Sequence, residues 1–593
     1  MISLKVDATD TARGIFRVSQ SVPLGPARSL TLLYPKWLPG NHAPRGPLQN
    51  LAGLRMEAEG RPVAWTRDPL EPYAFHVALP EGAGRLDISF DYLTPVVREQ
   101  GRVVVTPDML NLQWNAVILY PAGHYTRDIQ VTPELVLPAD WQAASALEAA
   151  SREGQTTRYR PVSVETLVDS PVFAGRHYRR VVLDGGPRPV ALNIFADAPE
   201  QLEATPAQIE AHRRLVAQAD RLFATRPFDR YEFLLALSAR LGGIGLEHHR
   251  SSENGVGQGY FLNWDGSAPD RDLLPHEYAH AWNGKHRRPA DLWTPDFQTP
   301  MRNSLLWVYE GQTQYWGYVL AARAGLITRQ EMLDALAMTA ATYELRPGRS
   351  WRPLGDTVND PVVLARRPQP WTSWQRNEDY YSEGQLLWLE VDALIRERSG
   401  TRRSLDDFAR RFLGGSDGDW GVSVYDFDQV VAALEAVEPY DWRGFLTRRV
   451  NEAPAPLEGL SRAGYRLVYD ETPSAYFSAD EQARKILDHT YSIGLVLNRD
   501  GEIRSVLWEG PAWRAGLTNA AKIVAVNGWS FEPERLKNEI ARTRTPGVGL
   551  ELLVKEAERY RTVRIDYAGG LRYPHLERLP GRRDLLGDIL KPR

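Results

Sequence analysis

Two stretches of this 593-residue chain decide how its centre folds: 273-LLPHEYAHAWNGK-285 and 305-LLWVYEGQTQYWGYV-319. His276 and His280 are four positions apart, so on a helix their directions differ by about 40° and both imidazoles can face one ion. Pro275 suits the first turn of a helix, where its missing N–H costs nothing. The first stretch therefore predicts a short helix that presents two histidines on one face.

Two glutamates provide the carboxylates that such a histidine pair needs. Glu277 lies about 100° round the helix from His276, where it can act as the base for a metal-activated water. The second stretch is mostly apolar, and a single carboxylate there is unfavourable unless it is paired or bound to a metal. Two His and one Glu with an open fourth position form the catalytic zinc pattern. We expect one Zn²⁺ per chain, held by both histidines and Glu310; the alternative for Glu310 is an ion pair with Arg302 or Lys285.

The composition excludes several classes of protein. Hydrophobic residues make up 43% and charged residues 25% of the chain, which is typical of globular proteins and excludes extensive disorder. The net charge of −4 gives no electrostatic case for a nucleic-acid or acidic-membrane partner. The absence of cysteine excludes disulfides, thiolate metal sites and a Cys nucleophile. No run of about 18 apolar residues predicts a membrane span.

The compartment stays open at this stage. The first residues, 1-MISLKVDATDTARG-14, have no basic region followed by an apolar region. We therefore expect a cytoplasmic protein or, if a signal peptide has been removed, a periplasmic or secreted one.

The hydrophobic pattern of the sequence changes along the chain, and this change predicts several domains. Period-2 segments such as 74-AFHVALP-80 and 86-LDISFDYL-93 indicate an all-β domain. A buried-strand candidate, 231-YEFLLAL-237, then follows a helical stretch, and helices dominate to about residue 450, which indicates an α/β lobe joined to a helical lobe. The expected fold class is multidomain α+β. The predicted divisions are a β-sandwich-like domain (1–172), a catalytic domain (173–455), a linker (456–485) around the Pro-rich 451-NEAPAPLEGL-460, a compact unit of short strands (486–570) and a tail (571–593).

These motifs resemble those of a known family. The metal stretches are similar to those of the gluzincin metallopeptidases, and more closely to those of the glycyl-aminopeptidase family of PDZ-containing zinc peptidases. The resemblance covers nearly the whole chain and includes 34-YPKWLPGNH-42, 245-GLEHHRSS-252 and 380-YYSEG-384. It implies a thermolysin-like catalytic domain and a PDZ-like unit at 486–570.

In the PDZ-like unit, 492-SIGLVLN-498 resembles a carboxylate-binding loop that leads into an edge strand. Capture of a peptide by β-augmentation is one role for this unit. Packing against the catalytic lobe is the other, and both stay open.

The same resemblance implies how a substrate is held. Glu247 matches the glutamate that binds the substrate N-terminus in related aminopeptidases, and a carboxylate can hold an ammonium by charge-assisted hydrogen bonds. Gly245 could permit a tight first subsite. His248 and His249 could line the cleft, and for both the alternative is an ordinary polar side chain.

A second implied group stabilises the oxyanion of the reaction. Tyr381 occupies the position of the tyrosine that does this in gluzincins, and Tyr380 is the alternative in register. Glu383 stands where lysine is common in the relatives, which is a departure in the local electrostatics.

Taken together, the residues and the resemblance predict a zinc aminopeptidase that hydrolyses the N-terminal bond of peptides with a free N-terminus. A preference for Gly or Ala is implied by the resemblance alone. Two other functions stay open, a zinc endopeptidase and a non-catalytic PDZ peptide-binding protein. The sequence does not fix the oligomeric state or the physiological substrate.

Overall fold

The computed structural model describes residues 1–26, 28–452 and 455–593. Contacts between Cα atoms divide the chain into two units. The predicted boundaries at 172 and 455 do not coincide with this division, and residues 453 and 454 of the predicted boundary stretch lie outside the described residues. Unit 1 comprises Met1–Leu262, His276–Asn303 and Leu413–Asp426, and unit 2 comprises Asn263–Pro275, Ser304–Phe412 and Phe427–Arg593.

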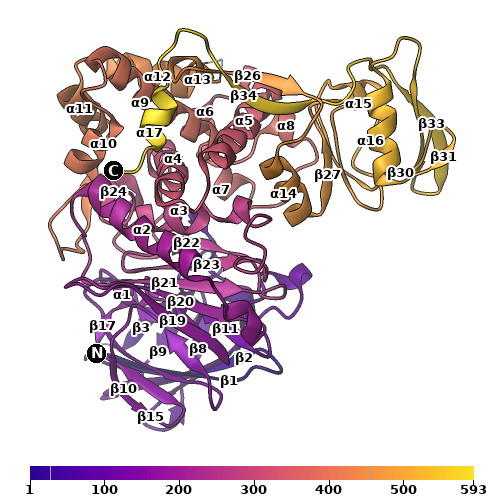
Figure 1. Ribbon diagram of the computed structural model, residues 1–593. Coiled ribbons are helices and arrows are strands. Elements are labelled where there is room, and N and C mark those ends of the chain that lie inside the picture. The colour runs from indigo at the N-terminus through magenta and orange to yellow at the C-terminus, as the bar shows by residue number, and fades with distance from the viewer. Residues whose placement is uncertain (27, 453–454) are drawn as a thin grey trace. The chain divides into compact units, whose positions relative to one another are not determined.

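A nine-stranded sheet forms the largest part of the N-terminal region of unit 1 (Figure 1). Its strands follow the order β15-β16-β13-β1-β2-β10-β6-β7, and β17 also pairs with β13. The bounds are β1 (Ile2–Asp10), β2 (Ile15–Pro23), β6 (Leu51–Ala58), β7 (Arg61–Pro62), β10 (Arg85–Leu93), β13 (Gln130–Val136), β15 (Ala149–Glu153), β16 (Thr156–Tyr159) and β17 (Val162–Ser163).

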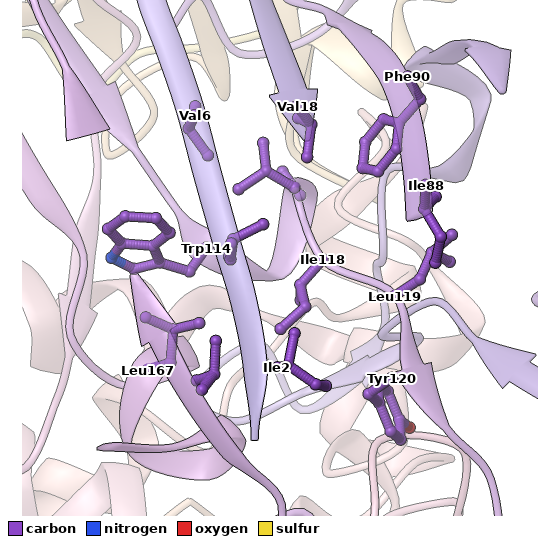
Figure 2. Packing of buried hydrophobic residues seen from close by; sticks show 14 of the residues in the cluster. Ile2, Val6, Val18, Ile88, Phe90, Trp114, Ile118, Leu119, Tyr120 and Leu167 are labelled. Atoms are coloured by element: carbon purple, nitrogen blue, oxygen red, sulfur yellow. The ribbon is translucent and has the colours of Figure 1, made fainter. Parts of the chain in front are cut away.

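The period-2 pattern of this region places one face of the sheet in a core. Along β1, Ile2, Leu4 and Val6 are buried whereas the residues between them are not. Figure 2 shows Ile2 and Val6 in the same cluster as Val18 and Trp114. A second sheet, β12 (Tyr120–Pro121), β3 (Ser29–Leu33), β9 (Ala74–Ala78) and β8 (Trp65–Arg67), contributes to the same core. The predicted β-rich N-terminal region is confirmed.

A five-stranded mixed sheet follows in unit 1, in the order β19-β20-β21-β23-β22. Its central strands β20 (Val190–Ala196), β21 (Tyr231–Leu237) and β23 (Ser251–Val256) run parallel. Helix α2 (Pro206–Phe223) lies between β20 and β21 in sequence and starts with a capping box at Thr205. The edges are antiparallel strands, β19 (His177–Asp184) and β22 (Gly245–Glu247). The predicted α/β lobe is present.

Helices dominate the first half of unit 2, as the sequence predicts. The long ones are α4 (Leu306–Ala324), α5 (Arg329–Leu345) and α9 (Ser382–Ser399), followed by α11 (Phe427–Val437) and α12 (Trp442–Asn451). Helices α4 and α9 have buried residues on nearly all of their faces, as expected of helices inside a core. Among the described residues, none of the helices is both long enough and apolar enough to cross a bilayer.

Two glycines allow α4 and α9 to approach each other closely. A Cβ atom at Gly311 would lie 2.8 Å from the Gly384 Cα atom and 2.6 Å from the Tyr380 carbonyl oxygen. Atoms this close belong to the backbone and cannot turn away. Gly311 and Gly384 therefore let the start of α9 lie close against the first turns of α4.

The predicted linker, residues 456–485, is built of regular elements. It contains α13 (Glu458–Arg462), β26 (Tyr465–Asp470) and α14 (Ala475–Arg484). The predicted tail supplies β34 (Tyr573–Arg578), which pairs antiparallel with β26, and the short helix α17 (Leu585–Leu590). Both segments therefore belong to the folded part of unit 2.

The C-terminal unit of short strands has its own apolar core, but its predicted edge strand is central. β28 (Leu495–Asn498) pairs on one side with β27 (Ile486–His489) and on the other with β29 (Ile503–Val506). The expectation of an edge strand is wrong because the residues just before the loop fold back as a hairpin. A peptide cannot add to β28 unless it displaces a neighbour. The remaining strands form the sheet β31-β30-β32-β33, and their bounds are β30 (Ala521–Val526), β31 (Trp529–Ser530), β32 (Leu550–Glu556) and β33 (Arg559–Ile565).

Replacement of Gly311 by alanine tests the close helix crossing. Alanine favours a helix over glycine by about 1 kcal/mol, which alone would stabilise α4. Steric overlap with backbone atoms costs about 1–3 kcal/mol and acts in the opposite direction. Because the neighbours cannot move aside, we expect Gly311→Ala to lower the thermal unfolding midpoint. A midpoint equal to or above that of the wild type, measured by circular dichroism, would contradict the crossing.

Candidate metal and peptide site

Helix α3 (Leu273–Ala279), called the metal helix below because it carries the first predicted metal motif, brings the two predicted histidine ligands together. The Nε2 atoms of His276 and His280 are 3.1 Å apart, and both side chains are buried. His280 lies just beyond the last α-helical residue, but its N–H still donates to the His276 carbonyl at 3.3 Å, so the i, i+4 spacing holds. Tyr278 faces the opposite way and packs its ring 4.7 Å from that of Tyr231 in the sheet.

The orientation of the His280 ring follows from its second nitrogen. Its Nδ1 lies 2.8 Å from the carbonyl oxygen of Asn283. Because a carbonyl oxygen only accepts, Nδ1 carries the proton and Nε2 keeps its lone pair. A hydrogen bond of this kind to the outer nitrogen is what fixes metal-binding histidines in other proteins.

The spacing of the two imidazoles fits a tetrahedral ion. Bonds of about 2.05 Å from Zn²⁺ to two imidazole nitrogens separate those nitrogens by about 3.3 Å. The observed 3.1 Å is close to this value. Donor atoms of His280, Glu247 and Glu277 also lie within 4.8 Å of one another, and all three side chains are buried. The pair of imidazoles therefore has two carboxylates next to it, and the donor set suits a divalent cation.

Glu247 ends the short edge strand β22, which pairs antiparallel with β23. Its side chain is only 3% exposed. Gly245, two residues earlier, is exposed and pairs with Asn254. The predicted role of Glu247 in binding the substrate N-terminus stays a prediction.

Both ring nitrogens of His248 lie next to carboxylate groups. Its Nδ1 lies 3.2 Å from Asp169 and its Nε2 lies 2.9 Å from Glu253, both at carboxylate oxygens. Burial by itself would lower the pKa of His248, but hydrogen bonds and charge from these two carboxylates raise it to about 9. His248 is therefore an imidazolium inside a buried ion network, and its predicted role in substrate binding has no support from these contacts.

The network extends to other parts of unit 1. The Lys285 ammonium lies 2.6 Å from Asp169, and the side-chain amides of Asn111 and Gln113 donate to Glu253 at 2.6 and 2.9 Å. Lys285, which is five residues after His280, thus pairs with Asp169. These contacts link the N-terminal β-rich region and the five-stranded sheet to the segment that follows helix α3.

His249 is held differently. Its Nε2 lies 2.8 Å from the Pro227 carbonyl oxygen, so this nitrogen carries the proton. Burial lowers the pKa of His249 to about 3, and the ring is neutral. The contacts of His249 are thus those of a buried, hydrogen-bonded side chain, and a place for it in the cleft stays a prediction.

In unit 2, Glu310 and Tyr381 occupy neighbouring parts of the α4–α9 crossing. Glu310 lies in the second turn of α4 and is 1% exposed. Tyr381 is the residue before α9, and its ring is 4.8 Å from that of Tyr380. Burial raises the pKa of Tyr381 well above its usual range, and the charge of Glu310 raises it further. The phenol of Tyr381 therefore stays protonated and can donate a hydrogen bond.

The negative charge of Glu383, which stands where lysine is common in the relatives, is compensated by neighbouring side chains. Its carboxylate forms ion pairs with Arg349 and Arg376, and all three side chains are buried. Arg376 also pairs with Asp379 at 2.7 Å. A glutamate in place of lysine thus adds no uncompensated charge beside Tyr381. Neither this pairing nor the His248 network could be predicted, because the partners are scattered along the sequence.

Two protein-family models match the chain. The model of the peptidase M61 N-terminal domain matches residues 3–176, and that of M61 glycyl aminopeptidase matches residues 270–387. The second match contains His276, Glu277, His280, Glu310 and Tyr381. These matches support a metallo-aminopeptidase, the predicted enzyme class. The PDZ-like unit lies outside both matches and stays a prediction. No curated protein matches the chain.

Solved structures resemble the chain at low sequence identity. An aminopeptidase N family protein from Idiomarina loihiensis aligns over 100% of both chains with 18% identity and a TM-score of 0.78. An M1 zinc metallopeptidase from Deinococcus radiodurans, bound to a Tyr-Ser-Ala substrate, aligns over 77% of this chain and 95% of its own, with 15% identity and a TM-score of 0.47. The first likeness concerns the fold alone, and the second is too distant to add to it.

The charge of His248 predicts a pH-dependent stability. Its folded pKa of about 9 lies above its usual 6.5, so its contribution is complete below pH 6.5 and is lost as the pH rises through 9. Because His248→Gln removes the cation that pairs with the buried Glu253 carboxylate, we expect a loss of about 3 kcal/mol in unfolding free energy at pH 6. Urea unfolding at pH 6 and pH 10 measures this difference, which should shrink at pH 10. His124, which is exposed, gives the control His124→Gln. An equal effect of both variants would contradict the network.

Proposed function

We propose that this chain is a zinc aminopeptidase that releases the first residue of peptides with a free N-terminus. The observation that carries the proposal is the His276–His280 pair, 3.1 Å apart at Nε2, with the Glu247 and Glu277 carboxylates beside it. Two metal ligands, a base and an acceptor for an ammonium are what hydrolysis at an N-terminus requires.

Glu310 is proposed as the third ligand. It lies on α4, the helix formed by the second motif, and the family resemblance makes this glutamate the partner of His276 and His280 in holding the ion. Its carboxylate is buried, which suits a ligand whose charge a divalent cation balances.

The chemistry divides between the ion and the side chains. Zn²⁺, when bound by these three residues, would polarise the scissile carbonyl and acidify a water molecule. Glu277 takes a proton from the attacking water and delivers it to the amine that leaves. Tyr381, protonated because of its high pKa, donates a hydrogen bond to the oxyanion.

Glu247 sets where the peptide is cut. Its buried carboxylate accepts hydrogen bonds from the substrate ammonium, so only the bond that follows the first residue reaches Glu277. A preference for Gly or Ala is part of the proposal on the strength of the family resemblance, with Gly245 at the start of β22. An endopeptidase would have no need of Glu247 and would cleave blocked peptides equally well. A protein that only binds peptides would not need Glu277.

A panel of amino-acid p-nitroanilides separates these functions. We expect hydrolysis of free Gly and Ala substrates, none of their N-acetylated forms, and loss of activity with a chelator that returns on addition of Zn²⁺. Glu247→Ala should raise KM for the free substrates by roughly tenfold or more, since a charge-assisted hydrogen bond is lost. Cleavage of the acetylated substrates by the wild type would favour the endopeptidase.

Glu277→Gln tests the base without removing a ligand. The amide keeps the size of the side chain but cannot take a proton, so we expect kcat to fall at least about 100-fold while one Zn²⁺ per chain remains bound. The matched variant Glu310→Gln should instead reduce the zinc content, measured by atomic absorption. Full activity of Glu277→Gln, or unchanged zinc in Glu310→Gln, would overturn the respective assignment.

A further inference from the structure

The motif 34-YPKWLPGNH-42 forms a tight hairpin in unit 1. Strands β4 (Trp37–Leu38) and β5 (Ala43–Pro44) pair antiparallel, and Pro39–His42 make the turn between them. Gly40 has φ +76° and His42 has φ +51°, both in the left-handed region. A non-glycine residue there is uncommon, and such strained residues cluster at functional sites.

Gly40 lies directly against Glu247. A Cβ atom at Gly40 would be 2.9 Å from the Glu247 Oε2 atom and 2.7 Å from the Leu246 Cδ1 atom. Two features therefore require glycine at this position. The backbone has a positive φ, and the Glu247 carboxylate occupies the space that a Cβ atom would need. The backbone of the turn limits where the Glu247 carboxylate can lie.

His42 reaches the same carboxylate from the other end of the turn. Its side chain is 1% exposed, and a ring nitrogen lies within 4.8 Å of a carboxylate oxygen of Glu247. An ammonium has three N–H donors, and one carboxylate does not by itself surround them. An imidazole nitrogen beside Glu247 is a suitable further acceptor.

The hairpin is held in this position by the segment that follows the metal helix. The Phe297 carbonyl accepts hydrogen bonds from the backbone N–H groups of Lys36 and Trp37, at 3.2 and 2.8 Å. The Asn303 amide donates to the His42 carbonyl at 2.9 Å. The Phe297 ring belongs to the core of the N-terminal region, with Tyr120 at 5.9 Å in an edge-on arrangement. The turn is thus fixed at both ends.

We propose that the Pro39–His42 turn is a substrate-binding element: Gly40 positions the Glu247 carboxylate, and His42 joins Glu247 in holding the ammonium of the substrate. This inference rests on the proposed aminopeptidase function. It assigns part of the selection of free N-termini to the N-terminal β-rich region.

Gly40→Ala tests the positioning, and Gly123→Ala is its matched control. Both glycines have positive φ, so both variants carry the same kind of backbone strain, but no atom lies within 4 Å of a Cβ at Gly123. With Ala-p-nitroanilide we expect Gly40→Ala to lower kcat/KM at least about tenfold with wild-type zinc content. Gly123→Ala should keep wild-type kinetics. Equal kinetics of the two variants would overturn the proposal.

His42→Gln and His42→Leu test the second acceptor, and they also serve if Gly40→Ala does not fold. The two side chains are similar in size and share the backbone strain, but only glutamine has an acceptor oxygen. We expect His42→Leu to raise KM for Ala-p-nitroanilide at least fivefold, with little change in kcat, and His42→Gln to restore most of the loss. Equal KM values for the two variants would overturn the role of His42.

Glu247→Ala separates this inference from the proposed function. If Glu247→Ala loses activity while Gly40→Ala and His42→Leu keep it, the turn has no role although the aminopeptidase stands. If Glu247→Ala is fully active, ammonium binding at Glu247 fails, and the role of the turn fails with it.

Discussion

Burial of carboxylates is the constraint on which the centre of unit 1 depends. Glu247, Glu253 and Glu277 are each less than 5% exposed. Ionised carboxylates in such surroundings are very costly unless cations or donors compensate them. His248 supplies a positive charge to Glu253, with Lys285 and Asp169 completing that part of the network. Glu247 and Glu277 lie beside His280, where the proposed divalent ion and substrate ammonium would add positive charge.

This arrangement separates a structural group of charges from the group that we propose to be reactive. The structural group has partners within 3.2 Å and links β23 to Lys285, in the segment after helix α3. The second group consists of the carboxylates that we propose to act on the ion and the peptide. Glu247 and His248 are neighbours in sequence but belong to different groups, because successive residues of an extended chain point to opposite sides.

The sequence predicted those parts of the site that depend on local geometry. The i, i+4 spacing placed His276 and His280 on one face, and 231-YEFLLAL-237 matched β21 in full. Pairings between distant segments were not predictable. Asp169 pairs with Lys285, and Arg349 with Glu383, without any local signal of the partner. The edge strand at 492-SIGLVLN-498 was wrong for the same reason, since β27 lies outside the motif.

The insertion of Phe297 into the N-terminal core has a consequence for how the chain could be divided. A fragment that starts at residue 173 would keep the metal helix but would expose Phe297 and lose its contact with Tyr120. It would also lack Asn111, Gln113 and Asp169, so Glu253 and Lys285 would be buried without those partners. The peptidase part therefore depends on contacts with the β-rich region that precedes it, and it is not an independent folding fragment.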